Sequence, residues 1–337
     1  MFFYIAVYLI IIYFINNFFS KKKILESNTG SNHQSFVNNS VPLSGGIFIF
    51  FPVLNLLMYD QALAGLIFFL FFTLGLYSDL NILSSPKKRF LVQIIILIIF
   101  VFFSKLSVLP TRIEFIDKIF SYPILNYIFT VFCLMVLING SNFIDGLNGL
   151  LVGYFLTVLF FIYYLDLLNF SDLKNFKELF LLITILFFIV MNFTNKLFLG
   201  DNGSYSLSFL MGVLLINIYN SNNNVSPYFI ILLLWYPCFE NLFSIIRKFI
   251  EKKNPLKPDN DHLHQLIYFF IKKNYRLKSL TSNNTSSLIL IIFNFLILYV
   301  ASLDIYHTRH QLIVLSFALL IYLITFFNIK NILKRSI

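Results

Sequence analysis

The sequence predicts an all-α polytopic membrane protein of about 10 or 11 transmembrane helices, built as one integral-membrane domain over residues 1–337. Hydrophobic residues make up 58% of the chain and charged residues only 12%, about half the charged fraction of a typical soluble domain. Apolar runs of about 16 to 20 residues recur from end to end, as in membrane-spanning helices. These runs do not alternate between apolar and polar residues, which argues against a β-barrel.

The apolar runs define the expected elements in order. The candidate spans are 2–19, 45–60, 62–78, 90–109, 122–139, 146–167, 178–194, 204–219, 228–246, 286–304 and 311–329. The first span lacks a basic leader and is followed by Lys21-Lys22-Lys23, which favours a retained helix over a cleaved signal peptide.

The basic residues orient these spans. One of the two alternating sets of connections holds 19 of the 25 Lys and Arg residues, and it includes the long loop 247–285. Because cytoplasmic loops carry such an excess, we expect this set in the cytoplasm and the N-terminus outside. The net charge of +10 then reflects basic loops beside anionic lipid heads, and nucleic acid is not an expected partner.

Five polar segments fall on the predicted cytoplasmic side, each beside a span. They are Pro42–Gly46, Ser78-Asp79, Asn139–Gly149, Gly200–Ser204 and Asn254–Gln265. An error of one span in the count would divide them between the two faces of the bilayer. Their agreement predicts a single cytoplasm-facing active site.

Three aspartates, Asp79, Asp145 and Asp201, each lie where an apolar run meets a short polar turn. Any one of them could simply cap a helix, and that alternative stays open. Glycines beside Asp145 and Asp201 let the backbone approach a ligand closely, and helix N-termini bind anions. Carboxylates beside anion sites suit a Mg²⁺–phosphate ligand, whereas the spacing of Cys and His residues does not favour zinc.

The segment Asn254–Gln265 adds two histidines, His262 and His264, in the longest polar loop. On a helix, residues two apart point to different faces, so the two histidines need not act as a pair. A solvated loop in which histidine merely occurs is the alternative. Arg247 and the nearby lysines either bind substrate phosphates or lie against lipid heads.

Taken together, these segments resemble the polyprenyl-phosphate N-acetylhexosamine-1-phosphate transferases, relatives of phospho-N-acetylmuramoyl-pentapeptide transferase. The resemblance covers about residues 42–267, with the segments in the family's order. It implies a multi-pass enzyme of the bacterial inner membrane, with a homodimer left open. The enzyme would transfer a sugar 1-phosphate from a UDP-N-acetylamino sugar to polyprenyl phosphate in the bilayer, release UMP, and so initiate a lipid-linked cell-envelope glycan such as an O-antigen or a cell-wall polymer.

The resemblance also assigns roles to residues. Asp201 matches the aspartate that holds Mg²⁺, with Mn²⁺ as an alternative metal, and Asp145 and Asn142 match residues at the nucleotide and phosphate end. His262 and His264 match the donor-contacting histidines, and Asp79 matches the second of two paired aspartates. The expected catalytic residues are Asp79, Asp145, Asp201, His262 and His264, and the expected substrate-binding residues are Asn142, Asn148, Gly45, Gly46 and Arg247.

The chain departs from the family pattern at several positions. Ser78 replaces the first paired aspartate, so either Asp79 suffices or the largely dianionic acceptor phosphate needs no general base. Asn148 stands where the muramoyl branch has aspartate, and that branch's triple-histidine signature is absent, which favours an N-acetylhexosamine donor. Glu240 and Arg247 resemble a family Asp and Arg at the end of the ninth span.

Two other classes of function remain as alternatives. A transporter or lipid flippase would have ionisable groups within its spans and inverted repeats, and the sequence shows few of the former and no clear example of the latter. An inactive relative that only binds lipid-linked sugar is the second alternative, kept open by Ser78.

Overall fold

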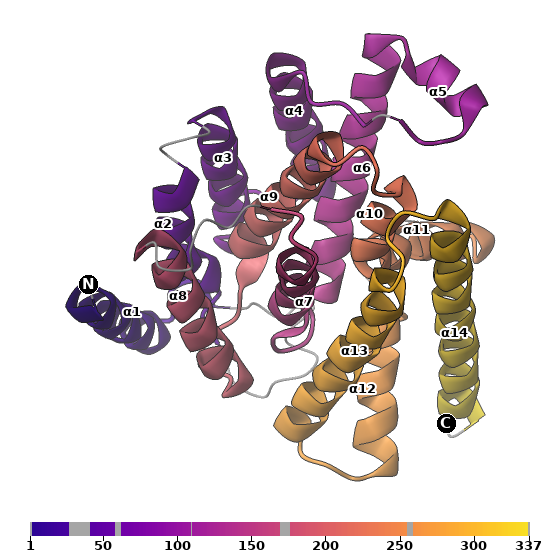
Figure 1. Ribbon diagram of the computed structural model, residues 1–337. Coiled ribbons are helices and arrows are strands. Elements are labelled where there is room, and N and C mark those ends of the chain that lie inside the picture. The colour runs from indigo at the N-terminus through magenta and orange to yellow at the C-terminus, as the bar shows by residue number, and fades with distance from the viewer. Residues whose placement is uncertain are drawn as a thin grey trace.

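The computed structural model describes residues 2–26, 41–57, 62–108, 110–168, 176–254 and 259–335, and within these ranges the ordered elements are helices (Figure 1). The N-terminal half contains α1 (Phe2–Lys22), α2 (Gly45–Leu57), α3 (Ala62–Asp79), α4 (Pro86–Ser104), α5 (Glu114–Phe120), α6 (Pro123–Ile144) and α7 (Leu150–Tyr164). The C-terminal half contains α8 (Phe176–Phe193), α9 (Gly200–Ser221), α10 (Pro227–Leu233), α11 (Trp235–Ile250), α12 (Leu263–Asn274), α13 (Ser279–Ser302) and α14 (Thr308–Arg335).

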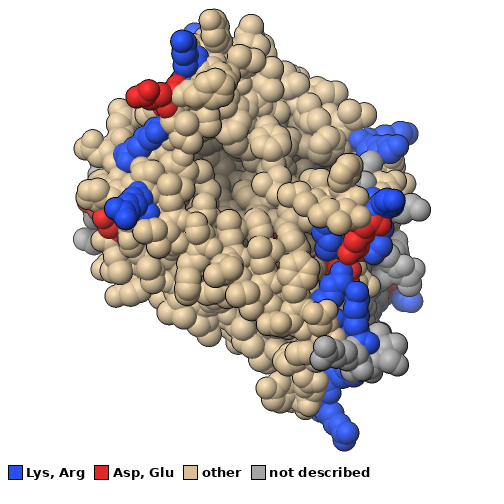
Figure 2. Space-filling view, turned by 90° about the vertical axis from the view of Figure 1, so that its right-hand side faces the viewer, with Lys and Arg blue, Asp and Glu red and all other residues tan. Residues whose placement is uncertain are grey.

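The helices confirm an all-α polytopic membrane protein. Over the described ranges, five helices are long and apolar enough to cross a membrane, namely α1, α3, α6, α13 and α14. The pair α10 and α11 gives a sixth if it counts as one span, and α2 and α7 are shorter apolar helices. On the face shown in Figure 2, charged side chains gather at two opposite edges, and a broad uncharged band separates them. Such a band is the surface that lipid tails require.

The ninth expected span, 228–246, is wrong as a single helix. The chain bends by 78° between α10 and α11. Pro237 explains the break, because its ring excludes the helical hydrogen bond to the carbonyl four residues earlier, at Leu233. The Tyr154 hydroxyl donates to that Leu233 oxygen at 2.9 Å, so the freed carbonyl keeps a partner in the core.

Other boundaries differ from the expected ones in ways that matter for the site. The expected connection 140–145 is mostly helical, because α6 continues to Ile144. Asp201 lies in the first turn of α9 rather than before it. The loop 247–285 contains α12, which the sequence analysis did not predict. The end of the second expected span, 58–60, and Pro255 of the histidine segment lie outside the described residues.

Helix α9 is the central element, and aromatic side chains pack around its middle. The Phe209 ring stacks on Phe71 of α3 at 5.2 Å between centroids and meets Phe100 of α4 edge-on at 4.9 Å. All three side chains are buried. These contacts join three helices that are well separated in the sequence, and such aromatic pairs add to the stability that burial provides.

Glycines allow the N-terminal end of α9 to approach its neighbours at backbone distance. A Cβ added to Gly75 of α3 would overlap the backbone of Asp201 and Asn202, and one added to Gly46 of α2 would overlap Asn202 and Gly203. The Gly45 and Gly46 amides also donate to carbonyls just before α9, those of Phe198 at 2.8 Å and Leu199 at 3.0 Å. The start of α9 is therefore fixed against α2 and α3.

We predict that Gly75→Ala destabilises the protein, because the new methyl group has no space against α9. The cost expected for such overpacking is about 1–3 kcal/mol of unfolding free energy, measured as a lower Tm in detergent. Gly65→Ala in the same helix is the matched control, since its Cβ would meet only the Leu57 Cβ at 3.7 Å. An equal loss of Tm in both variants would contradict the close approach at Gly75.

Candidate active site

Asp79, the last residue of α3, caps the N-terminus of α9. The backbone N–H of Asp201 donates to Asp79 Oδ1 at 2.9 Å, and that of Asn202 donates to Asp79 Oδ2 at 3.0 Å. The residue preceding α9, Leu199, offers no capping side chain, so a carboxylate from another helix satisfies these donors. The negative charge also suits the positive end of the helix dipole.

Gly200 completes this junction. Its φ of +81° lies in the left-handed region, and an added Cβ would sit 2.8 Å from Asp79 Oδ2. Both the backbone conformation and the space therefore require glycine. The capping role that the sequence analysis left open for Asp79 is present in the structure, while its catalytic role stays a prediction.

The Asp201 carboxylate is held on both oxygens by side chains, three of them from other helices and one, Tyr205, from α9 itself. Asn142 Nδ2 of α6 donates to Oδ1 at 2.6 Å. Oδ2 accepts from the Ser78 hydroxyl at 2.6 Å, from Arg89 Nη1 at 2.6 Å and from the Tyr205 hydroxyl at 3.2 Å. The Asp201 side chain is still 21% exposed. It is therefore a fixed carboxylate that a ligand can reach.

Arg89 is a site residue that the sequence analysis did not identify, because it counted only as a basic loop residue. It belongs to the first turn of α4, which begins at Pro86, a favoured residue at a helix start. Its Nη1 also donates to the Ser78 hydroxyl. The signal in the sequence that could have identified Arg89 was a basic residue one turn inside an apolar helix. Arg89 places a positive charge beside Asp201.

The donor set around Asp201 fits a magnesium ion better than a zinc ion. Over the described residues, no group of three or more His, Cys, Asp or Glu side chains could hold a metal. Mg²⁺ needs only one or two protein carboxylates when substrate phosphates and water complete its shell, whereas structural zinc needs four protein ligands. One reachable, oriented carboxylate meets the magnesium requirement.

Asp145 and Asn148 lie in the turn between α6 and α7. Asp145 is buried and follows the last residue of α6. Asn148 donates through its backbone N–H to Asn283 Oδ1 at 2.7 Å, and through Nδ2 to Asn195 Oδ1 at 2.6 Å and Asn284 Oδ1 at 3.0 Å. These bonds tie the turn to α13 and to the connection before α9. Substrate binding by Asn148 stays a prediction.

Glu240 of α11 positions the histidine segment. Its Oε1 lies 3.0 Å from His262 Nδ1 and accepts the backbone N–H of Leu263 at 3.2 Å. Because a carboxylate only accepts, Nδ1 carries the proton in this contact. The same oxygen therefore orients the imidazole and caps the start of α12. Glu240 is buried, being only 1% exposed.

The two histidines lie beside one another and against the α6–α7 motif. His262 precedes α12 with an extended backbone rather than lying in the helix, so the helical spacing does not separate the rings. The rings stack with centroids 5.6 Å apart, and His262 lies 5.1 Å from the Phe143 ring. A Cβ at Gly146 would lie 2.9 Å from His264 Nε2, so this glycine permits the contact.

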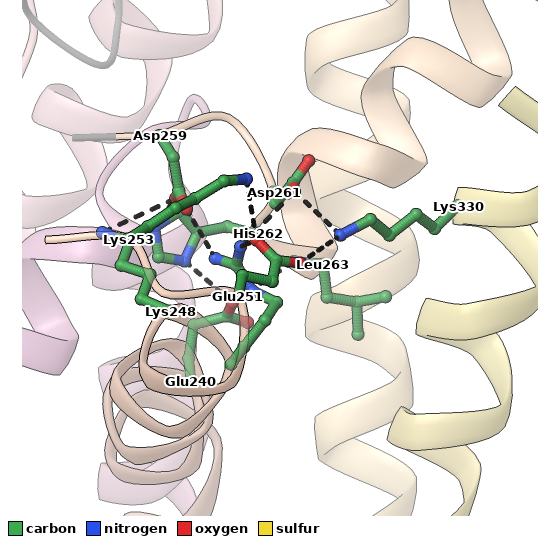
Figure 3. A network of polar contacts seen from close by, with 10 residues as sticks. Glu240, Lys248, Glu251, Lys253, Asp259, Asp261, His262, Leu263 and Lys330 are labelled. Carbon is green, nitrogen blue, oxygen red and sulfur yellow. Dashed lines mark hydrogen bonds and ion pairs between the residues drawn. The ribbon is translucent and has the colours of Figure 1, made fainter. Parts of the chain in front are cut away.

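Arg247 of α11 forms ion pairs with two carboxylates of the loop that follows this helix. Its guanidinium contacts Asp259 at 2.8 Å and Asp261 at 3.4 Å. Figure 3 shows both aspartates in the network that also includes His262 and Lys330. Lys330 of α14 reaches Asp261 at 2.9 Å and Glu251 at 3.1 Å. Arg247 therefore fixes the loop beside His262, and its role in substrate binding stays a prediction.

Glu251 is paired with two lysines of this network, Lys253 and Lys330. Hydrogen bonds from Lys253 and Lys330 lower the pKa of its carboxyl from 4.5 to about 2. Since a lowered pKa stabilises the folded protein above the ordinary value, this contribution is present above about pH 4.5. It is lost as the pH falls towards 2.

The contacts bring several of the expected site residues together. Asp79, Asn142 and Asp201 meet directly, Phe143 and Gly146 meet the two histidines, and Gly45 and Gly46 hold the start of α9. This supports the expectation of one shared site.

We predict that Asp79→Asn destabilises the protein, because an amide can accept only one of the two α9 donors and turns an N–H₂ group towards the other. Leaving a buried donor unpaired costs about 1–3 kcal/mol, measured as a lower Tm in detergent. Asp304→Asn is the matched control, since Asp304 accepts the Tyr306 and His307 amides at 3.3 and 3.2 Å in an exposed loop. A melting temperature equal to wild type would rule out the capping role of Asp79.

Comparison with known proteins places this site in a family. The model of glycosyl transferase family 4 matches residues 62–219, which include Asp79, Asn142 and Asp201. The chain is 30% identical over 232 residues to an undecaprenyl-phosphate alpha-N-acetylglucosaminyl 1-phosphate transferase of Thermotoga maritima, covering 67% of this chain and 68% of the relative.

Two further relatives agree. A probable undecaprenyl-phosphate N-acetylglucosaminyl 1-phosphate transferase of Bacillus subtilis is 29% identical over 204 residues, covering 60% of this chain and 56% of the relative. A phospho-N-acetylmuramoyl-pentapeptide-transferase of Prochlorococcus marinus is 28% identical, and the match covers 57% of each chain. The chain thus spans little more than half the length of these two relatives. The similarity confirms the family that the motifs predicted, and the protein belongs to glycosyl transferase family 4.

Proposed function

We propose that this protein transfers an N-acetylhexosamine 1-phosphate from a UDP-sugar to polyprenyl phosphate and releases UMP. The observation that carries the proposal is the reachable Asp201 carboxylate, held by Ser78, Arg89 and Asn142 from three other helices. Two relatives are named as undecaprenyl-phosphate N-acetylglucosaminyl 1-phosphate transferases, which supports this reaction and favours N-acetylglucosamine as the sugar. Family membership favours the transferase over the transporter alternative.

The proposed step is a phosphoryl transfer. An oxygen of the acceptor phosphate forms a bond to the phosphorus that bears the sugar, while the bond to the UMP oxygen breaks and UMP leaves with the electron pair. Such reactions depend on positioning and on neutralising charge. Mg²⁺ held by Asp201 would supply neutralising charge on the donor diphosphate. Asn142 and Ser78 keep the Asp201 carboxylate oriented, and Arg89 adds a fixed positive charge beside it.

The hydrogen bonds of Asp79 support a reaction without a general base. Its two oxygens accept the Asp201 and Asn202 amides, and the Asn202 side chain donates to it as well. Asp79 is also buried, so both of its oxygens are engaged with α9 rather than open to the acceptor phosphate. Ser78 is a poor base by nature. A phosphate monoester is largely dianionic near pH 7, so the acceptor can attack without losing a proton.

The orientation in the membrane belongs to the same proposal. UDP-sugars are water-soluble donors, and the polyprenyl tail of the acceptor stays in the bilayer, so the site must face water at a lipid interface. The excess of Lys and Arg on one set of connections supports the cytoplasmic side of the inner membrane. His262 and His264 would contact the donor from the loop side.

We predict that Asp201→Asn lowers turnover by about 10²–10³-fold, because the metal loses its charged ligand. UMP release from a UDP-sugar panel and polyprenyl phosphate, titrated with Mg²⁺, measures the effect and identifies the donor. Asp304→Asn is the control, and Tm confirms that Asp201→Asn folds. Full turnover with unchanged Mg²⁺ dependence would remove Asp201 from the metal site. Wild-type protein without UMP release from any donor would favour the inactive alternative.

We also predict that Glu240 acts through His262. Glu240→Gln should lower turnover by about 10-fold, the effect usual for a group that orients a functional side chain. In a double-mutant cycle with His262→Ala, the second substitution should add little to the first, because both disturb the same imidazole. Additive losses would mean that Glu240 serves only the packing of α11 and α12.

A further inference from the structure

A cavity lies away from Asp201, between the end of α11, helix α12 and the last turns of α14. It is open to the outside and has a volume of about 1000 Å³. Five lysines line it, namely Lys253, Lys272, Lys273, Lys330 and Lys334. Nothing in the proposed reaction uses this cavity, since its lining contains neither histidine of the site.

The charge of the cavity is strongly positive. Two carboxylates line it, Glu251 and Asp261, and both already contact cations. Lys253 lies 2.7 Å from Glu251, and Lys330 bridges Glu251 and Asp261. The lining therefore carries three more cations than anions. An anionic ligand would balance this excess of positive charge, whereas a cation or a neutral molecule would leave it uncompensated.

The rest of the lining is apolar. Leu266 and Phe269 of α12 and Leu333 of α14 share the wall with the lysines. A free phosphate ion gains nothing from apolar side chains and fills a small part of this volume. A ligand with a phosphate next to hydrocarbon would use both parts of the wall.

The position of the cavity also points to lipid. Helix α14 is long and apolar enough to cross a membrane, and Lys330 and Lys334 lie in its last turns. They are four residues apart and so share one face of the helix. Lysines at the end of a membrane span lie at the level of lipid headgroups. Figure 2 shows Lys and Arg side chains gathered along the lower right edge of the face drawn.

We propose that this cavity binds the headgroup of an anionic phospholipid, with its phosphate among the lysines and its first acyl carbons against Leu266, Phe269 and Leu333. The lining contains none of the residues that hold Asp201, and the proposal does not depend on the proposed reaction. A bound phosphate would compete for Lys330, which otherwise contacts Asp261, the neighbour of His262. Lipid binding would thus affect the histidine segment by weakening the ion pair between Lys330 and Asp261.

The test compares two triple variants that lose the same charge. Lys272→Gln/Lys273→Gln/Lys334→Gln removes exposed lysines of the cavity, and Lys21→Gln/Lys22→Gln/Lys23→Gln removes exposed lysines at the end of α1. Phosphatidylglycerol binding to the full-length protein in phosphatidylcholine nanodiscs is measured for each by native mass spectrometry. Melting temperatures in the same nanodiscs confirm the fold.

We expect the cavity variant to lose about 10- to 100-fold in affinity for phosphatidylglycerol, since each charge-assisted hydrogen bond lost from a bound phosphate costs about 10-fold. The control variant should lose less than about 3-fold. Equal losses in the two variants would overturn the proposal, because they would show attraction of lipid to any basic patch. Displacement of the lipid by millimolar inorganic phosphate would also overturn it and identify a free phosphate site instead.

Discussion

The cap that Asp79 places on α9 is the contact on which the rest of the site depends. Asp201 is the second residue of α9, so any rotation of that helix moves its carboxylate. One residue of helix corresponds to about 100° of rotation. The cap fixes the rotation from α3, and the glycines at 46 and 75 hold the backbone close enough for it to form. Asn142, Ser78 and Arg89 can then reach a carboxylate whose position is already set.

A balance of charge follows from this placement. Asp79 and Asp201 are neighbouring acids at the end of apolar helices, where unpaired charge is expensive. The α9 backbone amides serve one carboxylate and Arg89 serves the other. The arrangement separates two tasks within one acidic pair. The buried member holds the helix, and the partly exposed member is left to meet a ligand.

Much of this was predictable from local sequence. The motifs around Asp145, Asp201 and His262 indicated the family. The count of spans and the polar segments at their ends predicted that these motifs lie on one side of the membrane. The cap of α9 was not predictable, because it requires knowing that residues 79 and 201 pack together. Helix α12 was missed because lysines and asparagines around it suggested a loop. Its buried Leu263, Leu266, Ile267 and Ile271 nevertheless follow helical spacing, so the signal was present.

The bend at Leu234 determines where the histidine segment reaches the site. Helix α11 has 16 residues, which corresponds to roughly 24 Å of length. After a turn of 78°, α11 leaves the direction of α10 and packs alongside α6. Asn241 meets the Val136 carbonyl of α6 at 3.0 Å along the way. A segment with the hydropathy of a membrane span is thus divided in two. Its second part brings Glu240 alongside α6, and His262, which contacts Glu240, lies 5.1 Å from the Phe143 ring near the end of α6.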